Sequence, residues 1–229
     1  KKEAQEIIIA SKKYDIILAV GHVERHNPVI STLQSFLEGK QSGDILTLTS
    51  RRFSNYPNRI NDVGVLFDLT IHDVEIINKI ANSNPLSIYA TGGKLRNDSY
   101  EDFVNVIINY ENGIIGVCQT NWLTPMKIRD LSITTTKNFI SLDFLKKRVE
   151  VISEYGKVDQ SNLYQTKIDF KTKSLPVSDQ EPLKLELIDF LESVQKKHSP
   201  LVSGYDGLNA VIVVQAALKS LTEKKIINV

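Results

Sequence analysis

The first residues of the chain change from a helical pattern to a short apolar run. Apolar side chains recur at helical spacing over residues 1–13, and residues 16–20 are then continuously apolar between Asp15 and Gly21. A run of this kind is typical of a strand buried on both faces of a parallel sheet. A helix followed closely by such a strand is half of a βαβ unit, so residues 1–22 are predicted to be the tail of a doubly wound α/β domain.

A period of two dominates the middle of the chain. Asn27 and Pro28 predict the start of a helix, because Asn is a good N-cap and Pro suits the first helical position. Residues 43–54 then alternate as a strand, and residues 64–82 have the pattern of a second helix. Further alternating stretches, separated by hairpin-like turns, predict an antiparallel meander over residues 87–92, 103–110, 114–122, 127–136, 139–144, 148–153 and 164–170.

Two amphipathic helices are predicted at the end of the chain, over residues 182–197 and 205–224. A run of strands followed by helices predicts an α+β fold, in which a large, mainly antiparallel sheet carries helices on one face. We expect residues 23–229 to form this domain. Its open face should expose apolar side chains and make a homodimer or homotetramer, with four candidates for that face: Ile107, Ile115, Val117 and Ile133.

Composition and charge narrow the functional classes. Of the 229 residues 41% are hydrophobic and 24% charged, which is typical of a globular protein. The formal net charge of +1 argues against a nucleic-acid or membrane-surface partner. A single cysteine, Cys118, cannot form an internal disulfide, and no apolar run reaches the roughly 18–20 residues that a membrane span needs. We therefore expect a cytoplasmic protein.

Asp68 and His72 are the first candidates for chemistry. They are four residues apart in a predicted helix, so their side chains face the same way and can touch. A carboxylate beside an imidazole fixes its tautomer and raises its basicity, as a general base requires when a hydroxyl group loses its proton. An ordinary ion pair on the helix surface has the same spacing, so the pattern alone leaves both interpretations open.

Other polar residues lie at positions where ligands often bind. His22 directly follows the apolar run, and the carboxyl ends of strands line the ligand crevice of open α/β sheets. A loop with a solvated Glu24–Arg25 pair is the alternative for this segment. Arg51, Arg52 and Arg59, with Tyr56, form a basic cluster suited to phosphate recognition, although a solvated charge group is the alternative. The sequence has no spacing typical of a metal site and no Gly-x-Gly-x-x-Gly turn.

Two stretches of the sequence, residues 20–28 and 51–73, together resemble the Gfo/Idh/MocA family. The first contains Arg25-His26-Asn27-Pro28 after the apolar run, and the second leads from an arginine-rich strand to Gly64 and then Asp68-Leu-Thr-Ile-His72-Asp73. Within the family, the sequence is similar to the branch that acts on nucleotide-activated amino sugars, the UDP-N-acetylglucosamine 3-dehydrogenases.

The resemblance implies an NAD- or NADP-dependent dehydrogenase that transfers a hydride between nicotinamide and a carbon of a sugar or UDP-sugar. It also implies that residues 1–22 are the remnant of a Rossmann domain and residues 23–229 a substrate-binding and oligomerisation domain. The family's motif makes His72 the acid/base and Asp68 its partner. It places two further groups of side chains: His22, Arg25 and Asn27 beside the cofactor, and Tyr56, Arg59 and Asp73 beside the substrate.

The sequence departs from the family pattern in two respects. His26 stands where this branch typically has Phe, which we interpret as a local packing change. The family's glycine-rich turn and its Glu-Lys-Pro segment would precede residue 1, so we expect the chain to be part of a longer enzyme and inactive alone. A non-catalytic sugar-binding or oligomerisation module with the same fold is the alternative, and a scaffold domain without a ligand is another. The residues do not distinguish NAD from NADP, or one sugar from another.

Overall fold

A large mixed sheet forms the body of the molecule. The computed structural model describes residues 1–39, 42–57, 60, 62–96, 98–154 and 170–229. The strands are β1 Ile45–Phe53, β2 Pro85–Gly93, β3 Phe103–Tyr110, β4 Ile115–Asn121, β5 Ile128–Thr135, β6 Asn138–Asp143, β7 Arg148–Glu154, β8 Phe170–Leu175 and β9 Ile227–Asn228. The predicted strand over residues 164–170 lies outside the described residues except for Phe170, where β8 begins.

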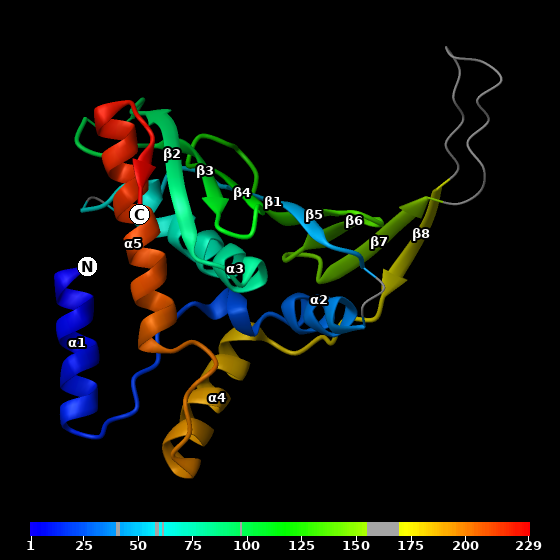
Figure 1. Cartoon of the computed structure of the whole chain (residues 1–229), viewed down its shortest axis with the longest axis horizontal. Coiled ribbons are helices and arrows are strands. Elements are labelled where there is room, and N and C mark those ends of the chain that lie inside the picture. Colours follow the sequence, from blue (N-terminus) through cyan, green and yellow to red (C-terminus); the bar gives the residue numbers. More distant parts are fainter. Residues whose placement is uncertain (40–41, 58–59, 61, 97, 155–169) are drawn as a thin grey trace.

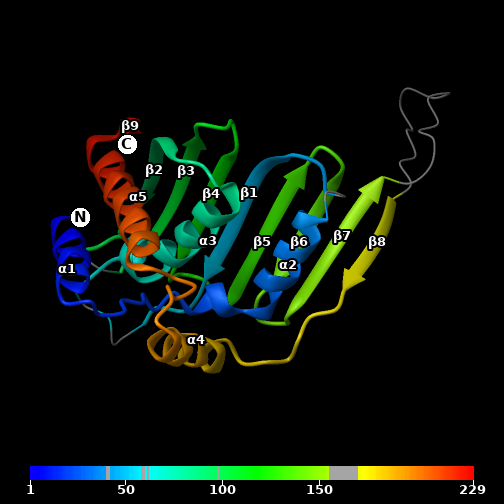
Figure 2. The same cartoon turned by 60° about the horizontal axis from the view of Figure 1, so that its bottom comes forward.

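Five α-helices accompany the sheet in the described part of the chain: α1 Lys2–Lys13, α2 Pro28–Glu38, α3 Ile71–Ala81, α4 Pro182–Lys196 and α5 Gly204–Glu223. Helices α2, α3 and α5 lie over the same face of the sheet (Figures 1 and 2). This arrangement confirms the predicted α+β class. No helix of the described residues is long and apolar enough to cross a membrane.

The strand order differs from a simple meander. It is β8-β7-β6-β5-β1-β4-β3-β2-β9, with β1 inserted between β4 and β5. Strand β1 pairs with β4 in parallel and with β5 in antiparallel orientation. The predicted meander is therefore correct within β2–β4 and within β5–β8, but wrong as one continuous unit.

The face beneath the helices holds the core. The row Ile108, Gly116, Leu48, Ile133 and Ile140 crosses five strands and is buried throughout. Assigning Ile133 to the open face was wrong, because it is paired with Leu48 and is 0% exposed. Since side chains alternate between faces, the neighbours of Ile133 point outward instead.

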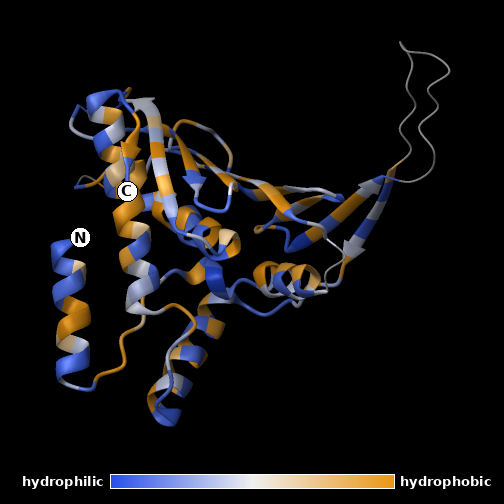
Figure 3. Cartoon of the chain, viewed as in Figure 1, coloured by the Kyte–Doolittle hydropathy of each residue, from blue (hydrophilic) through white to orange (hydrophobic). Residues whose placement is uncertain are grey.

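The other face of the sheet carries apolar side chains, and no helix of the described residues covers it. Ile107 is 39% and Ile115 38% exposed. Val117 is partly buried and is paired with Ile107 on one neighbouring strand and with Thr49 on the other. Apolar and polar residues alternate along these strands (Figure 3). The same face also bears the ion pair between Arg51 and Asp130, so it is mixed in character.

The predicted strand over residues 16–20 does not form. Ala19 makes a single antiparallel bridge with Ser203, and Ile16 is 62% exposed. The described chain places no other strand beside this segment. Gly207 lets the segment pack closely against α5, because a Cβ there would meet Val20 at 2.8 Å. The division into residues 1–22 and 23–229 stays a prediction.

The helix predicted over residues 64–82 begins as a π-helix, η2 Leu66–Thr70, before it continues as α3. The Thr70 hydroxyl donates to the Val65 carbonyl at 3.1 Å, five residues earlier. Ahead of η2, the Glu101 carboxylate accepts from the Leu66 amide at 3.0 Å and occupies the space where a Cβ on Gly64 would lie. Single π-helical turns are rare and are frequent at functional sites.

Candidate active site

His22 and His72 meet although they are 50 residues apart in sequence. His22 precedes a short 3-10 turn, η1 Val23–His26, and His72 lies in the first turn of α3. Their Nδ1 atoms are 3.1 Å apart, and their rings are edge-on, with centroids 5.1 Å apart and planes at 80°. His22 is 5% exposed and His72 is partly exposed. The contact leaves Nε2 as the second ring nitrogen of His72.

Burial lowers the pKa of both imidazoles to about 4. Next to His22, Arg25 adds to the lowering and Asp206 opposes it. For His72, the charges of Arg52 and Arg129 lower the pKa further, whereas Glu24 raises it. Both rings are therefore neutral at neutral pH. A neutral imidazole has one donor and one acceptor nitrogen, so this pair can hold one hydrogen bond between its Nδ1 atoms.

Asp68 lies in η2, one turn before His72, and is partly buried. The structure pairs the Nδ1 atom of His72 with His22, so one of the two ring nitrogens of His72 has an imidazole partner. The catalytic role of Asp68 remains a prediction. Its place on a π-helical turn beside His72 is the feature that keeps it a candidate.

A network of charged side chains, buried except for the partly exposed Arg129, lies beside the histidine pair. The Asp73 Oδ1 atom accepts from Arg52 Nε at 3.0 Å and from Nη2 at 2.7 Å. The Glu24 carboxylate lies 3.5 Å from Arg52 Nη1 and 2.9 Å from Arg129 Nη1. These two carboxylates and two guanidinium groups balance in charge. The network thus ties η1 to β1, α3 and β5.

Arg25 forms a second buried ion pair. Its Nη1 atom donates to Glu75 Oε1 at 2.5 Å, and both side chains are at most 2% exposed. Burial raises the pKa of Glu75 to about 7, against the lowering effect of Arg25. Two nitrogens of Arg25, Nε and Nη2, and the Glu75 Oε2 atom are buried without a hydrogen-bond partner.

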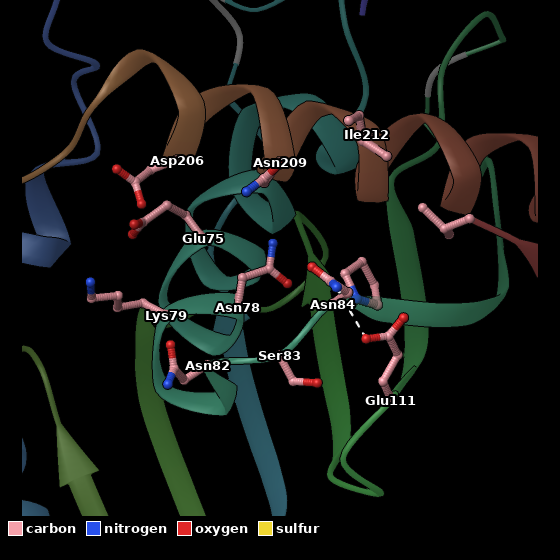
Figure 4. A pocket seen from close by; sticks show the side chains of 12 residues that line it. Glu75, Asn78, Lys79, Asn82, Ser83, Asn84, Glu111, Asp206, Asn209 and Ile212 are labelled. Carbon is pink, nitrogen blue, oxygen red and sulfur yellow. Dashed lines mark hydrogen bonds between the residues drawn. The ribbon is translucent and has the colours of Figure 1, made fainter.

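Glu75 also lines a polar groove between α3 and α5. The groove has a volume of about 780 Å³, and Figure 4 shows Glu75 and Asp206 on its two helices. Asparagines contribute much of the remaining lining: Asn78, Asn82, Asn84 and Asn209. His22 and His72 are not among the lining residues, so this groove is separate from the histidine pair.

Asn27 has a structural role that the sequence indicates. Its Oδ1 atom accepts from the Val29 amide at 3.2 Å and caps α2, as its position before Pro28 predicts. Its Nδ2 atom donates to Glu24 Oε2 at 3.0 Å. Each of the three side chains assigned to the cofactor therefore has a hydrogen-bond partner within the chain: His22, Arg25 and Asn27. Contact with a cofactor remains a prediction for each.

The three residues assigned to the substrate lie in different settings. Tyr56 is partly buried and packs edge-on against Trp122, with ring centroids 5.7 Å apart, and Arg96 lies over its ring. Asp73 is 4% exposed, and its carboxylate accepts a hydrogen bond from Arg52. Arg59 lies outside the described residues. A contact of these residues with substrate stays a prediction.

The predicted basic cluster divides between the two faces of β1. Arg51 points to the open face and binds Asp130, with Nη2 and Oδ2 2.6 Å apart, whereas Arg52 points inward. The alternation of side chains along a strand predicts this division. Sequence reasoning also missed Glu75 and Arg129, and it allowed Glu24 and Arg25 to be a solvated pair. No local signal marks such residues as buried, because their partners are distant in sequence.

Comparisons with known proteins find one family model and several related dehydrogenases. Residues 30–141 match the model of the GFO/IDH/MocA C-terminal domain. An uncharacterised oxidoreductase of Bacillus subtilis is 25% identical and a myo-inositol 2-dehydrogenase of Thermotoga maritima is also 25% identical; the alignments cover 96% and 97% of the chain. The chain spans 65% and 67% of the lengths of these relatives, about two thirds.

Solved structures show the same fold. A UDP-N-acetylglucosamine 3-dehydrogenase of Acidithiobacillus ferrooxidans superposes with a TM-score of 0.83 at 19% identity, over 97% of this chain and 68% of that one. A levoglucosan dehydrogenase in complex with NADH and levoglucosan superposes with a TM-score of 0.84 at 15% identity, over 100% of this chain and 70% of that one. The family match and the shared fold together identify residues 30–141 as part of a GFO/IDH/MocA C-terminal domain.

Proposed function

We propose that the chain is the substrate-side part of an NAD(P)-dependent oxidoreductase that acts on a sugar or nucleotide sugar. The observation that carries this proposal is His72, a neutral and partly exposed imidazole at the start of α3 whose Nδ1 atom is held by His22. An imidazole held by one nitrogen presents the other to a substrate hydroxyl. The names of the relatives, which include inositol and UDP-N-acetylglucosamine dehydrogenases, support the substrate class.

His72 supplies proton transfer in this proposal. As a sugar hydroxyl is oxidised to a carbonyl, the hydroxyl proton moves to His72 Nε2, and in the reverse direction His72 returns it. When bound, the nicotinamide supplies the chemistry of hydride transfer with the carbon that bears this hydroxyl. Arg52 and Arg129 lower the pKa of His72, so they disfavour its protonation in the resting state and keep it available as a base.

The fit of a nicotinamide cofactor rests on Arg25. Its Nε and Nη2 atoms are buried donors without partners, and a carboxamide or phosphate oxygen is an acceptor that would satisfy them. Arg25 would therefore hold the cofactor, with His22 and Asn27 beside it. The 229 residues contain no Gly-x-Gly-x-x-Gly turn for the pyrophosphate, so turnover would require a dinucleotide-binding segment in addition to them.

The first experiment measures dehydrogenase activity in the complete protein with UDP-N-acetylglucosamine and myo-inositol, by nicotinamide absorbance. His72→Ala should lower kcat by about 10²–10⁴-fold, the usual contribution of a general acid/base. Asp68→Asn should lower it less. His198→Ala, at the exposed end of α4, is the matched control and should leave kcat unchanged. Wild-type activity in His72→Ala would exclude the proposed role.

Self-association through the open sheet face is part of the same proposal. Its support is the group of exposed apolar side chains that includes Ile107 and Ile115. Ile107→Lys should convert the predicted dimer or tetramer to smaller species in analytical ultracentrifugation. Leu95→Lys, which alters a 72% exposed residue in a loop, is the control. A wild-type monomer, or an unchanged mass for Ile107→Lys, would contradict this interface.

The proposed location of the protein is the cytoplasm.

A further inference from the structure

The contact between His22 and His72 admits one proton. Their Nδ1 atoms face each other at 3.1 Å, which is hydrogen-bond distance. Two unprotonated nitrogens at this distance would direct lone pairs at each other, and two protonated nitrogens would bring their hydrogens into contact. One Nδ1 atom therefore donates and the other accepts, and the tautomers of the two rings are coupled.

We propose that His22 is a positioning residue, which accepts the Nδ1 proton of His72 and so keeps the Nε2 lone pair of His72 free for the substrate hydroxyl. This inference rests on the proposed function for its consequence in catalysis. A histidine that acts as a base must be unprotonated at the nitrogen that meets the substrate, and its other nitrogen is normally fixed by a hydrogen-bond partner. Here that partner is a second imidazole, where a carboxylate such as Asp68 was predicted.

An imidazole acceptor, unlike an amide or hydroxyl oxygen, can also take the proton. After His72 Nε2 receives the substrate proton, the bond between His72 Nδ1 and its hydrogen can break while a bond forms to His22 Nδ1. His72 is then neutral with its proton on Nε2, and the positive charge is on His22. No electrons are exchanged with any other group in this step.

The neighbouring charges differ at the two rings. His72 faces Arg52 of β1 and Arg129 of β5, with the Glu24 carboxylate of η1 as the opposing charge. His22 faces one cation, Arg25 of η1, and one anion, Asp206 of α5. These charges oppose a positive charge less at His22 than at His72, and burial lowers the pKa of both rings to about 4. A carboxylate partner could stabilise a protonated His72, but at this site it would not move the charge away from two arginines.

The ¹⁵N chemical shifts of the imidazole nitrogens test the coupling directly. The chain has four histidines, so the signals can be assigned by single substitutions. At neutral pH, His72 should be neutral with its proton on Nδ1, and His22 should be neutral with its proton on Nε2. In His22→Phe the acceptor is lost and His72 should change to the Nε2-protonated tautomer. His26→Phe, which alters another buried histidine next to the site, should leave the His72 signals unchanged.

A second variant separates hydrogen bonding from packing. His22→Asn keeps a hydrogen-bonding atom at the δ position, so His72 should keep its proton on Nδ1. In the complete protein, His22→Phe should lower kcat by at least about 10-fold with little change in KM, and shift the pH profile, whereas His22→Asn should keep most of the activity. Wild-type His72 protonated on Nε2, or the same tautomer in wild type and His22→Phe, would overturn the proposal. The tautomer is measured without substrate or cofactor, so this failure is distinct from failure of the proposed dehydrogenase activity.

Discussion

Asp73→Asn removes a negative charge from beside an arginine that is 3% exposed. In the wild type, Asp73 Oδ1 accepts from two nitrogens of Arg52, at 3.0 and 2.7 Å. The nearest remaining anion, Glu24, is 3.5 Å from Arg52 and is shared with Arg129. After the substitution, the guanidinium groups of Arg52 and Arg129 have one carboxylate, that of Glu24, as their shared partner. Breaking a buried ion pair in this way costs about 3–5 kcal/mol. Because Glu24 and the asparagine oxygen still offset part of the charge, we expect a loss of about 3 kcal/mol.

Urea denaturation, monitored by circular dichroism, measures this loss. The urea concentration at the unfolding midpoint should fall, while the dependence of the unfolding free energy on urea concentration should not change. The matched control is Asp130→Asn, which removes the partner of Arg51 on the same strand. That pair lies on the open face, with Arg51 51% and Asp130 24% exposed at the side chain, so the control should lose less than about 1 kcal/mol. If the two variants lose the same free energy of unfolding, burial does not control the strength of these pairs and the reasoning is refuted.

One further substitution and a change of pH test the surroundings of the site. Gly64→Ala should cost about 2 kcal/mol, measured by the same urea titration, because its Cβ would displace the buried Glu101 carboxylate from a backbone amide; a neutral effect would mean that Glu101 can move freely. The lowered pKa values of His22 and His72, about 4, predict pH-dependent stability. Below pH 6.5 the unfolded chain binds protons that the folded chain does not, so stability is complete above pH 6.5 and falls toward pH 4, by at most about 1.4 kcal/mol per pH unit for each histidine. Glu75, with its pKa raised to about 7, has the opposite slope between pH 4.5 and 7. Comparing wild type with His22→Phe cancels the Glu75 contribution; equal slopes in the two proteins would contradict the histidine assignment.

The local pattern predicts the elements well but not their order in the sheet. The predicted strand over residues 103–110 coincides with β3, and the end of the last helix is predicted to within one residue. Alternation reports which side chains share a face, and carries no information about which strand is the neighbour. The insertion of β1 between β4 and β5 was therefore not predicted. The error at Ile133 has the same origin, since the pairing with Leu48 determines which face is buried.

Only part of the site was predicted. Its chemistry depends on residue types, which are known from the sequence, whereas its geometry depends on contacts between residues that are distant in sequence. His72 was identified from a motif, and His22 from its position after an apolar run. Their contact joins residues 50 apart, which no spacing rule describes. The buried partners of Glu24 and Arg25 were missed for the same reason, because adjacent charges in a sequence give no sign that each has its own partner in the core.

Those two adjacent charges explain how the histidine pair is held. Glu24 binds Arg52 and Arg129, whereas Arg25 binds Glu75 of α3, so one 3-10 turn is attached to two strands and a helix. Asn27 adds a hydrogen bond to Glu24 and caps α2 at the end of the same turn. Buried ion pairs add little net stability compared with apolar side chains, but their directional bonds allow few arrangements. We infer that this turn retains charged residues because they fix the distance between His22 and α3. A hydrogen bond between two Nδ1 atoms tolerates only about a few tenths of an ångström of displacement, and the directional ion pairs on this turn restrict such displacement.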